Sequence, residues 1–105
     1  MNDKMDADTK EVIARLYDTS LSEADILSCI SILQMLLEVD GLMPLLHVVK
    51  SDYYSMSLRK QAAEAIFAIG NDYVKEEISA LLISSSPDLR SLARITLGKA
   101  PKVEN

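Results

Sequence analysis

The sequence predicts an all-α protein of one domain: a short right-handed α-solenoid of about three antiparallel helix hairpins, with six helices in residues 1–105. The first observation is a repeat, because much of the pattern of residues 58–70 returns in residues 89–98. A recurring amphipathic helix with a period in the thirties is typical of stacked helical hairpins. The second is that no stretch alternates apolar and polar residues long enough to form a strand. The third is that three Gly and three Pro leave little material for long loops or sheet turns.

The repeat is clearest at four pairs of positions, each 31 residues apart. These pairs are Leu58 with Leu89, Arg59 with Arg90, Ala62 with Ala93, and Ile66 with Leu97. Three pairs are identical and the fourth is aliphatic in both segments, so the two segments are expected to be equivalent helices of successive hairpins.

A first helix is expected over residues 9–18. Asp8 and Glu11 have the spacing of a capping box, in which the Asp8 carboxylate accepts from free backbone N–H groups. Four apolar side chains then share one helical face: Val12, Ile13, Leu16 and Tyr17. Residues 1–7 are mostly polar and are expected to be flexible.

A second helix is expected over residues 21–39, with Ser20 and Glu23 as another capping box. Its apolar stripe is broad, as in a helix packed on two sides. The stripe contains Ile26, Leu27, Cys29, Ile30, Ile32, Leu33, Leu36 and Leu37. Gly41 is free to adopt the left-handed conformation that ends a helix.

The second hairpin is expected to pair a helix over residues 42–50 with one over residues 56–69. Pro44 is tolerated in the first turn, where its missing N–H is not needed. Three alanines allow close approach of a neighbouring helix: Ala62, Ala63 and Ala65. Residues 51–55 form the connecting loop, and Gly70 closes the second helix.

The third hairpin is expected to contain a helix over residues 73–84 and a last helix that runs to residue 97. Ser86 as N-cap and Pro87 as the first helical residue mark the start of the last helix. Gly98 marks its end, and residues 99–105 are expected to be flexible.

Residues 41–70 and 71–98 both resemble HEAT repeats, whose second helix typically opens with an aliphatic residue and Arg and continues through small Ala positions to Leu-Gly. Residues 8–40 keep the hairpin layout without the Arg and Ala pattern, so they are interpreted as a diverged capping repeat. Three repeats are close to the minimum that buries a continuous core.

Arg59 and Arg90 are expected to be structural residues. Each lies early in the second helix of its repeat, where we expect it to bridge an acid of the same or the next repeat. The candidate acids are Asp52, Asp72 and Asp88.

The composition indicates an ordered cytoplasmic protein. Apolar residues make up 49% of the chain, enough for a core, and charged residues make up 26%. The single cysteine excludes an internal disulfide framework and suits a reducing compartment. The N-terminus has no apolar signal region, and the apolar runs are too short to span a membrane.

The charge is unevenly placed. Residues 1–40 carry nine acids and three bases, a net charge of −6, whereas residues 41–105 carry seven acids and eight bases, a net charge of +1. An acidic surface repels nucleic acid and anionic lipid and attracts a basic protein, although the charge also suits simple solubility. The candidate binding acids are Asp18, Glu23, Asp25, Glu38 and Asp40.

The sequence does not predict an enzyme. His47 lies in an apolar run and is expected at the edge of the core or on the surface, and Cys29 is expected to act as a small hydrophobe. A Cys29–His47 dyad would need an orienting group, and none is evident. No metal-ligand spacing and no Gly-rich phosphate loop occurs, so neither a metal nor a cofactor is expected.

Protein binding is therefore the predicted function. Tyr53 and Tyr54 lie in a loop, and exposed tyrosines are good interface anchors, although one of the two is expected to pack inward. Met43 and Met56 are expected either to add apolar surface near the same end or to belong to the core.

Three functional classes remain open. The most specific is a small cytosolic inhibitor, a monomer by default, that neutralises a basic toxin, as a bacterial immunity protein neutralises a nuclease. The alternative is a general adaptor or scaffold, and the third is an accessory module of a cofactor-handling enzyme. Fold alone does not decide among them.

Overall fold

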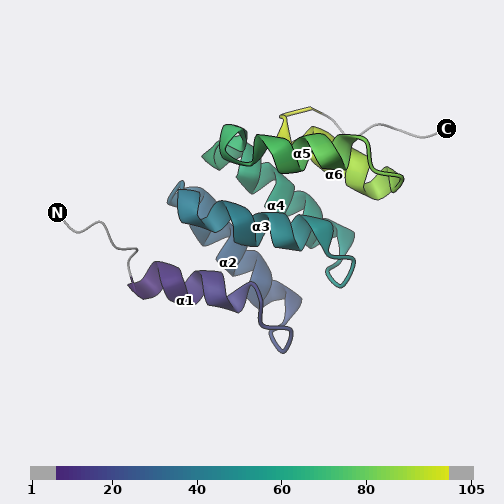
Figure 1. Ribbon diagram of the computed structural model, residues 1–105. Helices are drawn as coiled ribbons and strands as arrows, with labels where there is room; N and C mark the ends of the chain where they lie inside the picture. The colour runs from purple at the N-terminus through teal and green to yellow at the C-terminus, as the bar shows by residue number, and fades with distance from the viewer. Residues whose placement is uncertain (1–6, 100–105) are drawn as a thin grey trace.

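The computed structural model describes residues 7–99, and every regular element in that range is helical (Figure 1). The elements are α1 (Ala7–Arg15), α2 (Glu23–Met35), η1 (Val39–Gly41), α3 (Leu42–Lys50), α4 (Met56–Ile69), η2 (Asn71–Val74), α5 (Lys75–Leu82) and α6 (Pro87–Thr96), where η1 and η2 are short 3-10 helices. The predicted all-α class and the six α-helices are confirmed for this part of the chain.

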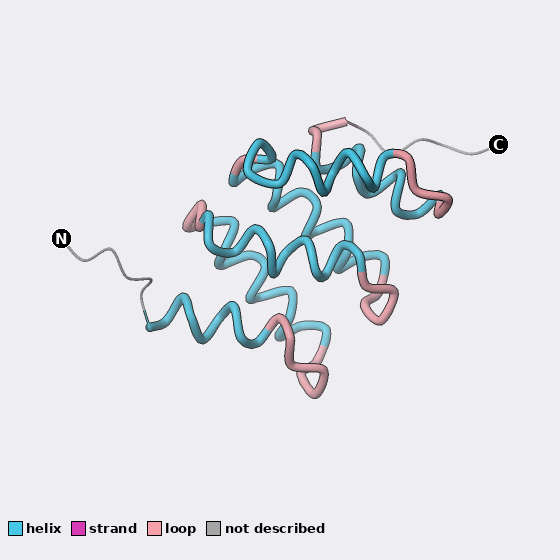
Figure 2. Tube along the Cα trace, in the orientation of Figure 1, coloured by secondary structure: helices cyan, strands magenta, loops and turns pink. Residues whose placement is uncertain are grey.

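The helices form two rows. In Figure 1, α1, α3 and α5 lie one above another in the nearer row, and α2, α4 and α6 lie behind them. Helix α4 is central, since it packs against α2, α3 and α6. Figure 2 shows the α1–α2, α3–α4 and α5–α6 connections at one edge and the α2–α3 and α4–α5 connections at the other. The first of these edges is called the loop edge below.

The core is built from apolar side chains of α2 to α6, joined by Leu16 and Tyr54 from two loops. Helix α4 contributes alanines as well as large residues, and Ala62, Ala63 and Ala65 are fully buried. Small side chains on a helix that touches three neighbours allow close packing without voids.

Serine N-caps start all three helices of the second row. The hydroxyls of Ser22, Ser55 and Ser86 accept from the backbone N–H three residues later, at 3.2, 3.3 and 3.3 Å. The cap at Ser86 was predicted, but the predicted cap at Ser20 is wrong. Ser20 instead donates to the Asp18 carboxylate in the loop before α2.

Several predicted helix limits need correction. Helix α1 ends at Arg15 rather than residue 18, and Asp8 lies inside its first turn rather than at its N-cap. Helix α2 ends at Met35 rather than residue 39. The predicted helix over residues 73–84 divides into η2 and the shorter α5.

The flexibility predicted for the two ends falls largely outside the described residues. Ala7 is already helical, and the Lys99 N–H donates to the Arg94 carbonyl at 2.9 Å. Flexibility itself is not tested at these two positions, and it stays a prediction for both ends.

The left-handed residue at the end of α2 is Leu37, with φ 51°, and not Gly41, whose φ is −85°. The Leu37 N–H donates to Gln34 O at 3.0 Å, and the Glu38 N–H donates to Leu33 O at 3.1 Å. These two bonds form a Schellman motif, which satisfies helix-end carbonyls and usually carries glycine at the left-handed position.

We expect Leu37→Gly to raise the free energy of unfolding by up to about 1 kcal/mol. A left-handed L-residue costs about 1–2 kcal/mol, of which the backbone entropy of glycine cancels a part. Little packing is lost, because Leu37 is 59% exposed. Urea denaturation measures the change. Leu36→Gly is the matched control: Leu36 is equally exposed but has a helical φ of −81°, so this change should destabilise.

Arg59 and Arg90 bind backbone carbonyls rather than the predicted acids. Arg59 Nε donates to Val49 O at 3.0 Å, and Arg90 Nη1 donates to Ser84 O at 2.8 Å. Each acceptor lies at or just beyond the end of the preceding helix, where carbonyls lack intrahelical partners. Arg59 therefore joins α4 to the end of α3, and Arg90 joins α6 to the segment that follows α5.

Candidate protein interface

Two neighbouring loops meet at the loop edge. The Tyr53 hydroxyl donates to the Thr19 carbonyl at 2.7 Å, and the Tyr54 hydroxyl donates to the Leu16 carbonyl at 2.5 Å. Both bonds join the α3–α4 loop to the α1–α2 loop. The two predicted anchor tyrosines thus differ in role, because Tyr54 is buried and Tyr53 is 60% exposed.

Aromatic rings form a continuous row along this edge. The ring centroids of Tyr17 and His47 are 4.6 Å apart, those of His47 and Tyr54 are 6.1 Å apart, and those of Tyr54 and Tyr53 are 5.0 Å apart. The last two pairs meet edge to face, a favourable geometry for aromatic rings. The row contains three of the chain's four tyrosines and its only histidine.

A pocket of about 260 Å³, called the loop pocket below, opens between the two loops. It is lined by Asp18, Leu21, Glu23, Ile26, Tyr53, Tyr54, Ser55 and Leu58. Four residues that the sequence singled out separately, two acids and two tyrosines, therefore meet at one place. The floor residues Leu21, Ile26 and Leu58 were predicted only as ordinary helix residues.

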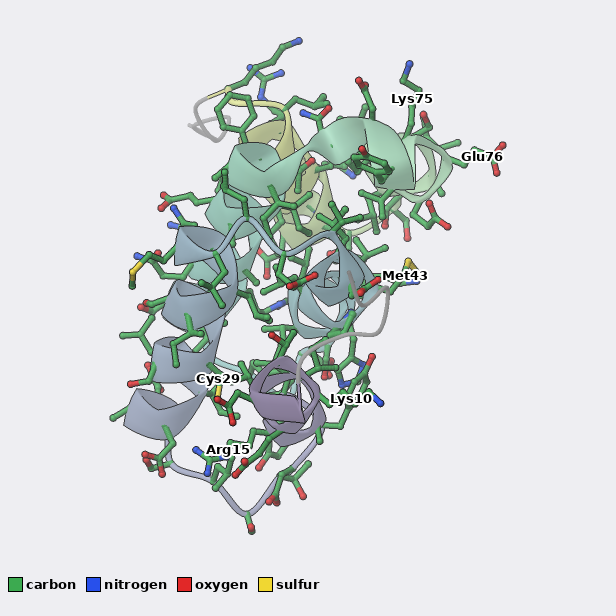
Figure 3. The ribbon with its side chains drawn as sticks, turned by 90° about the vertical axis from the view of Figure 1, so that its left-hand side faces the viewer. Lys10, Arg15, Cys29, Met43, Lys75 and Glu76 are labelled. Carbon is green, nitrogen blue, oxygen red and sulfur yellow. The ribbon has the colours of Figure 1, made fainter. Side chains whose placement is uncertain are left out.

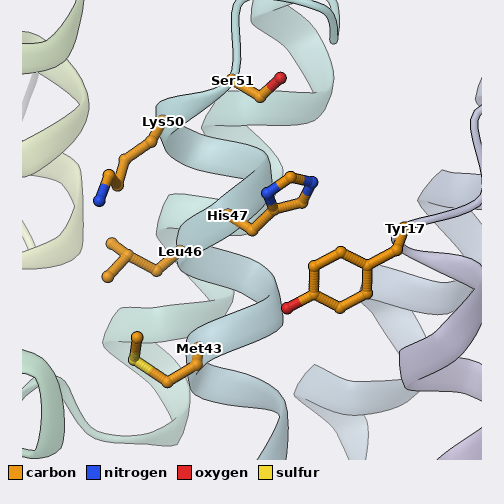
Figure 4. A pocket seen from close by; sticks show the side chains of 6 residues that line it. All are labelled: Tyr17, Met43, Leu46, His47, Lys50 and Ser51. Carbon is orange, nitrogen blue, oxygen red and sulfur yellow. The ribbon is translucent and has the colours of Figure 1, made fainter.

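A second hollow, of about 320 Å³, lies on the outer face of α3. Figure 4 shows Tyr17 and His47 on one side of this helix and Met43, Leu46 and Lys50 on the other. His47 is exposed, in agreement with a surface position, and Met43 is 54% exposed. The contact between His47 and Tyr54 makes this hollow a neighbour of the loop pocket.

The five predicted binding acids do not form one patch. Asp18 and Glu23 line the loop pocket, and Asp25 lies in the same first turn of α2 as Glu23. Glu38 and Asp40 lie beyond the opposite end of this 13-residue helix, which is about 20 Å long at 1.5 Å per residue. The acids therefore divide between the two edges of the molecule.

The Asp18 carboxylate is fixed in place by its own loop. Its Oδ1 accepts from the Ser20 hydroxyl at 2.6 Å and from the Ser20 N–H at 2.9 Å. These two bonds lower the pKa of Asp18 below its ordinary value, the hydroxyl contributing most. Asp18 is therefore ionised at neutral pH and presents a negative charge at the pocket rim.

Cys29 and His47 lie in different surroundings. Cys29 is buried where α2 faces α1 (Figure 3), and this burial raises the pKa of its thiol, partly opposed by the nearby Arg15. His47 is exposed and contacts aromatic rings. The thiol is therefore buried on α2, whereas the imidazole is exposed on α3.

Stability at alkaline pH should depend on Tyr54. Burial is the largest cause that raises the pKa of Tyr54 above its ordinary value of 10.0. The protonated form is thus favoured in the folded state, so its contribution is complete below pH 10 and is lost as the pH rises through the folded-state pKa. We expect the free energy of unfolding of Tyr54→Phe to fall less steeply with pH above pH 10. At neutral pH the same change should lower the free energy of unfolding by about 1 kcal/mol, because Leu16 O loses its donor.

Urea titrations at pH 7 and over the range from pH 9 upward measure both effects. Tyr53→Phe is the matched control, since it removes an exposed hydroxyl from the adjacent residue. If the free energy of unfolding fell equally steeply above pH 10 in Tyr54→Phe and in the unchanged protein, the role of Tyr54 in alkaline stability would be contradicted.

Comparisons with known proteins add no assignment: no family model, no curated protein and no solved structure matches this chain. In the part of the chain that the structure describes, no helix is long and apolar enough to cross a bilayer. Over the same residues, no group of three or more His, Cys, Asp or Glu side chains is placed to hold a metal ion.

Proposed function

We propose that this chain is a non-catalytic protein-binding module that neutralises a basic partner in the cytoplasm, as an immunity protein neutralises a toxin nuclease. In this proposal it is a right-handed α-solenoid of three antiparallel hairpins similar to HEAT repeats. The observation that carries it is the convergence of Asp18, Glu23 and Tyr53 at the loop edge.

The chemistry of that edge supports a protein partner. An exposed tyrosine held by a hydrogen bond supplies rigid contact area at low entropic cost, as interface anchors do. Acidic side chains around it accelerate the encounter with a basic protein and discriminate against acidic ones. The excess of acids in residues 1–40 extends the negative charge over the whole first hairpin.

Affinity purification with the full chain from its own cytosol tests the proposal. We expect one stoichiometric basic protein, identified by mass spectrometry, that is released at high salt, because rim charges are screened by ions. The purified partner should lose its own activity when the chain is added. Charge reversal at Glu23 and Asp25 should abolish this inhibition, and inhibition that survives the reversal would contradict the proposal.

An adaptor is the second candidate, and one observation favours it. Met35, Leu36 and Leu37 are 76%, 58% and 59% exposed at the edge opposite the loop edge. A run of exposed apolar residues marks an interaction surface in many proteins. A bridging protein needs two interaction surfaces, and this apolar run would be the second, beside the loop edge. Capture of several proteins that resists salt would favour an adaptor if the double variant Met35→Ser with Leu36→Ser abolished it.

A further inference from the structure

We infer that the loop pocket receives one arginine side chain of the partner, with its guanidinium between the Tyr53 ring and the carboxylates of Asp18 and Glu23. This inference rests on the proposed function, because it requires a basic partner. It adds the chemical group that is recognised and the place where it binds.

The size and floor of the loop pocket suit a single long side chain. Its volume of about 260 Å³ is below the range of about 300–1,000 Å³ that is usual for small-molecule sites. Ile26 and Leu58 are 2% and 3% exposed and form an apolar floor with Leu21. Arginine buries its aliphatic stem on such a surface while its charged end stays at the rim.

The rim provides the opposite charge. Asp18 and Glu23 both line the loop pocket, and none of the described lining residues is Lys or Arg. Ser20 fixes the Asp18 carboxylate through two hydrogen bonds to Oδ1, so little ordering is needed when a cation arrives. Preorganised acceptors of this kind increase affinity by reducing the entropy lost on binding.

The aromatic wall favours arginine over lysine. The Tyr53 ring is anchored at Thr19 O by its hydroxyl and meets Tyr54 edge to face at 87°, yet it remains 60% exposed. A planar guanidinium stacks on a ring face and donates in its own plane to carboxylates at the same time. An ammonium group offers no plane to stack.

The test uses three peptides, N-acetyl-Gly-Gly-Xaa-Gly-Gly-amide, in which Xaa is arginine, lysine or citrulline. Citrulline keeps the shape of arginine without its charge. Titration of the full 15N-labelled chain by NMR should shift the amides of Asp18, Glu23 and Tyr53 with the arginine peptide. We expect the lysine peptide to bind several-fold more weakly and the citrulline peptide on the order of tenfold more weakly.

Two variants with the same loss of charge separate the loop pocket from general acidity. Asp18→Asn with Glu23→Gln should weaken the arginine peptide by about five- to tenfold. Glu38→Gln with Asp40→Asn removes two charges at the other end of α2 and should leave its affinity unchanged. Tyr53→Leu should abolish the preference for arginine over lysine. The amide spectrum of each variant also reports whether it is folded.

Equal weakening by the two charge variants, or equal binding of citrulline and arginine, would overturn the inference. These outcomes are distinct from failure of the proposed function. If a basic partner is captured and both charge variants weaken it equally, the proposed function stands and the arginine site is wrong. If the arginine peptide binds as expected but no basic protein is captured, the proposed function fails and the site remains.

Discussion

Replacement of Arg59 by methionine is expected to lower the free energy of unfolding by about 2 kcal/mol. Arg59 is 6% exposed, and its Nε donates to Val49 O at 3.0 Å in a buried position. Methionine keeps the length of the side chain but leaves this helix-end carbonyl without a donor. The loss of a buried partner costs the desolvation of the group left behind, about 1–3 kcal/mol, and more when the donor is charged.

Removal of Arg59 also removes a buried charge, and the stability regained in this way is smaller than the stability lost. A buried guanidinium is itself costly when its N–H groups lack partners. Over residues 7–99, however, no buried side-chain nitrogen or oxygen is without one. Removal of Arg59 therefore relieves no unsatisfied group.

Arg90→Met is the internal comparison. Arg90 makes the equivalent bond to Ser84 O, but it is only partly buried, so water replaces the lost donor. We expect a loss below about 1 kcal/mol for this variant. Urea denaturation of both variants measures the difference, and equal losses would contradict the structural role assigned to Arg59.

For these two arginines the sequence predicted the positions but not the hydrogen-bond partners. The 31-residue spacing of Arg59 and Arg90 predicted equivalent positions, and each does bind a carbonyl at or beyond the end of the preceding helix, although the donor atoms and the separations along the chain differ. Their partners were predicted wrongly, because a sequence displays side-chain charges but not the carbonyls that a helix end leaves free.

The end of α2 was missed for a related reason. The apolar pattern continues through Leu36 and Leu37, and Gly41 follows as the expected terminator. The helix nevertheless ends at Met35, with Leu37 in the left-handed position that glycine normally takes. Leu36 and Leu37 are therefore exposed, whereas the apolar pattern predicted them as part of a buried stripe.

The acidic and aromatic members of the candidate site were predictable from the sequence, but their grouping and the apolar floor were not. Asp18, Glu23 and the two tyrosines were identified by charge and by their place in loops. The hydrogen bonds of Tyr53 and Tyr54 to Thr19 O and Leu16 O, which bring them together, span 34 and 38 residues. Glu38 and Asp40 were grouped with them by charge alone, and the length of α2 separates them.

Ala62→Leu is expected to have the largest effect on stability, a loss on the order of 3 kcal/mol. Ala62 is fully buried in α4, the helix that packs against α2, α3 and α6. An isobutyl group in a closely packed interior forces side chains out of their rotamers and moves neighbouring helices apart. A loss of this size is a large fraction of the about 5–15 kcal/mol that stabilises an ordinary domain.

Ala68→Leu is the matched control, because Ala68 lies on the exposed side of the same helix. The two substitutions add the same group to α4 and alter helix propensity equally, so their difference isolates the effect of packing. Thermal and urea unfolding should show Ala68→Leu close to the unchanged protein and Ala62→Leu strongly destabilised. If both variants were equally stable, α4 would not be closely packed at Ala62, and the central position of this helix between its three neighbours would be wrong.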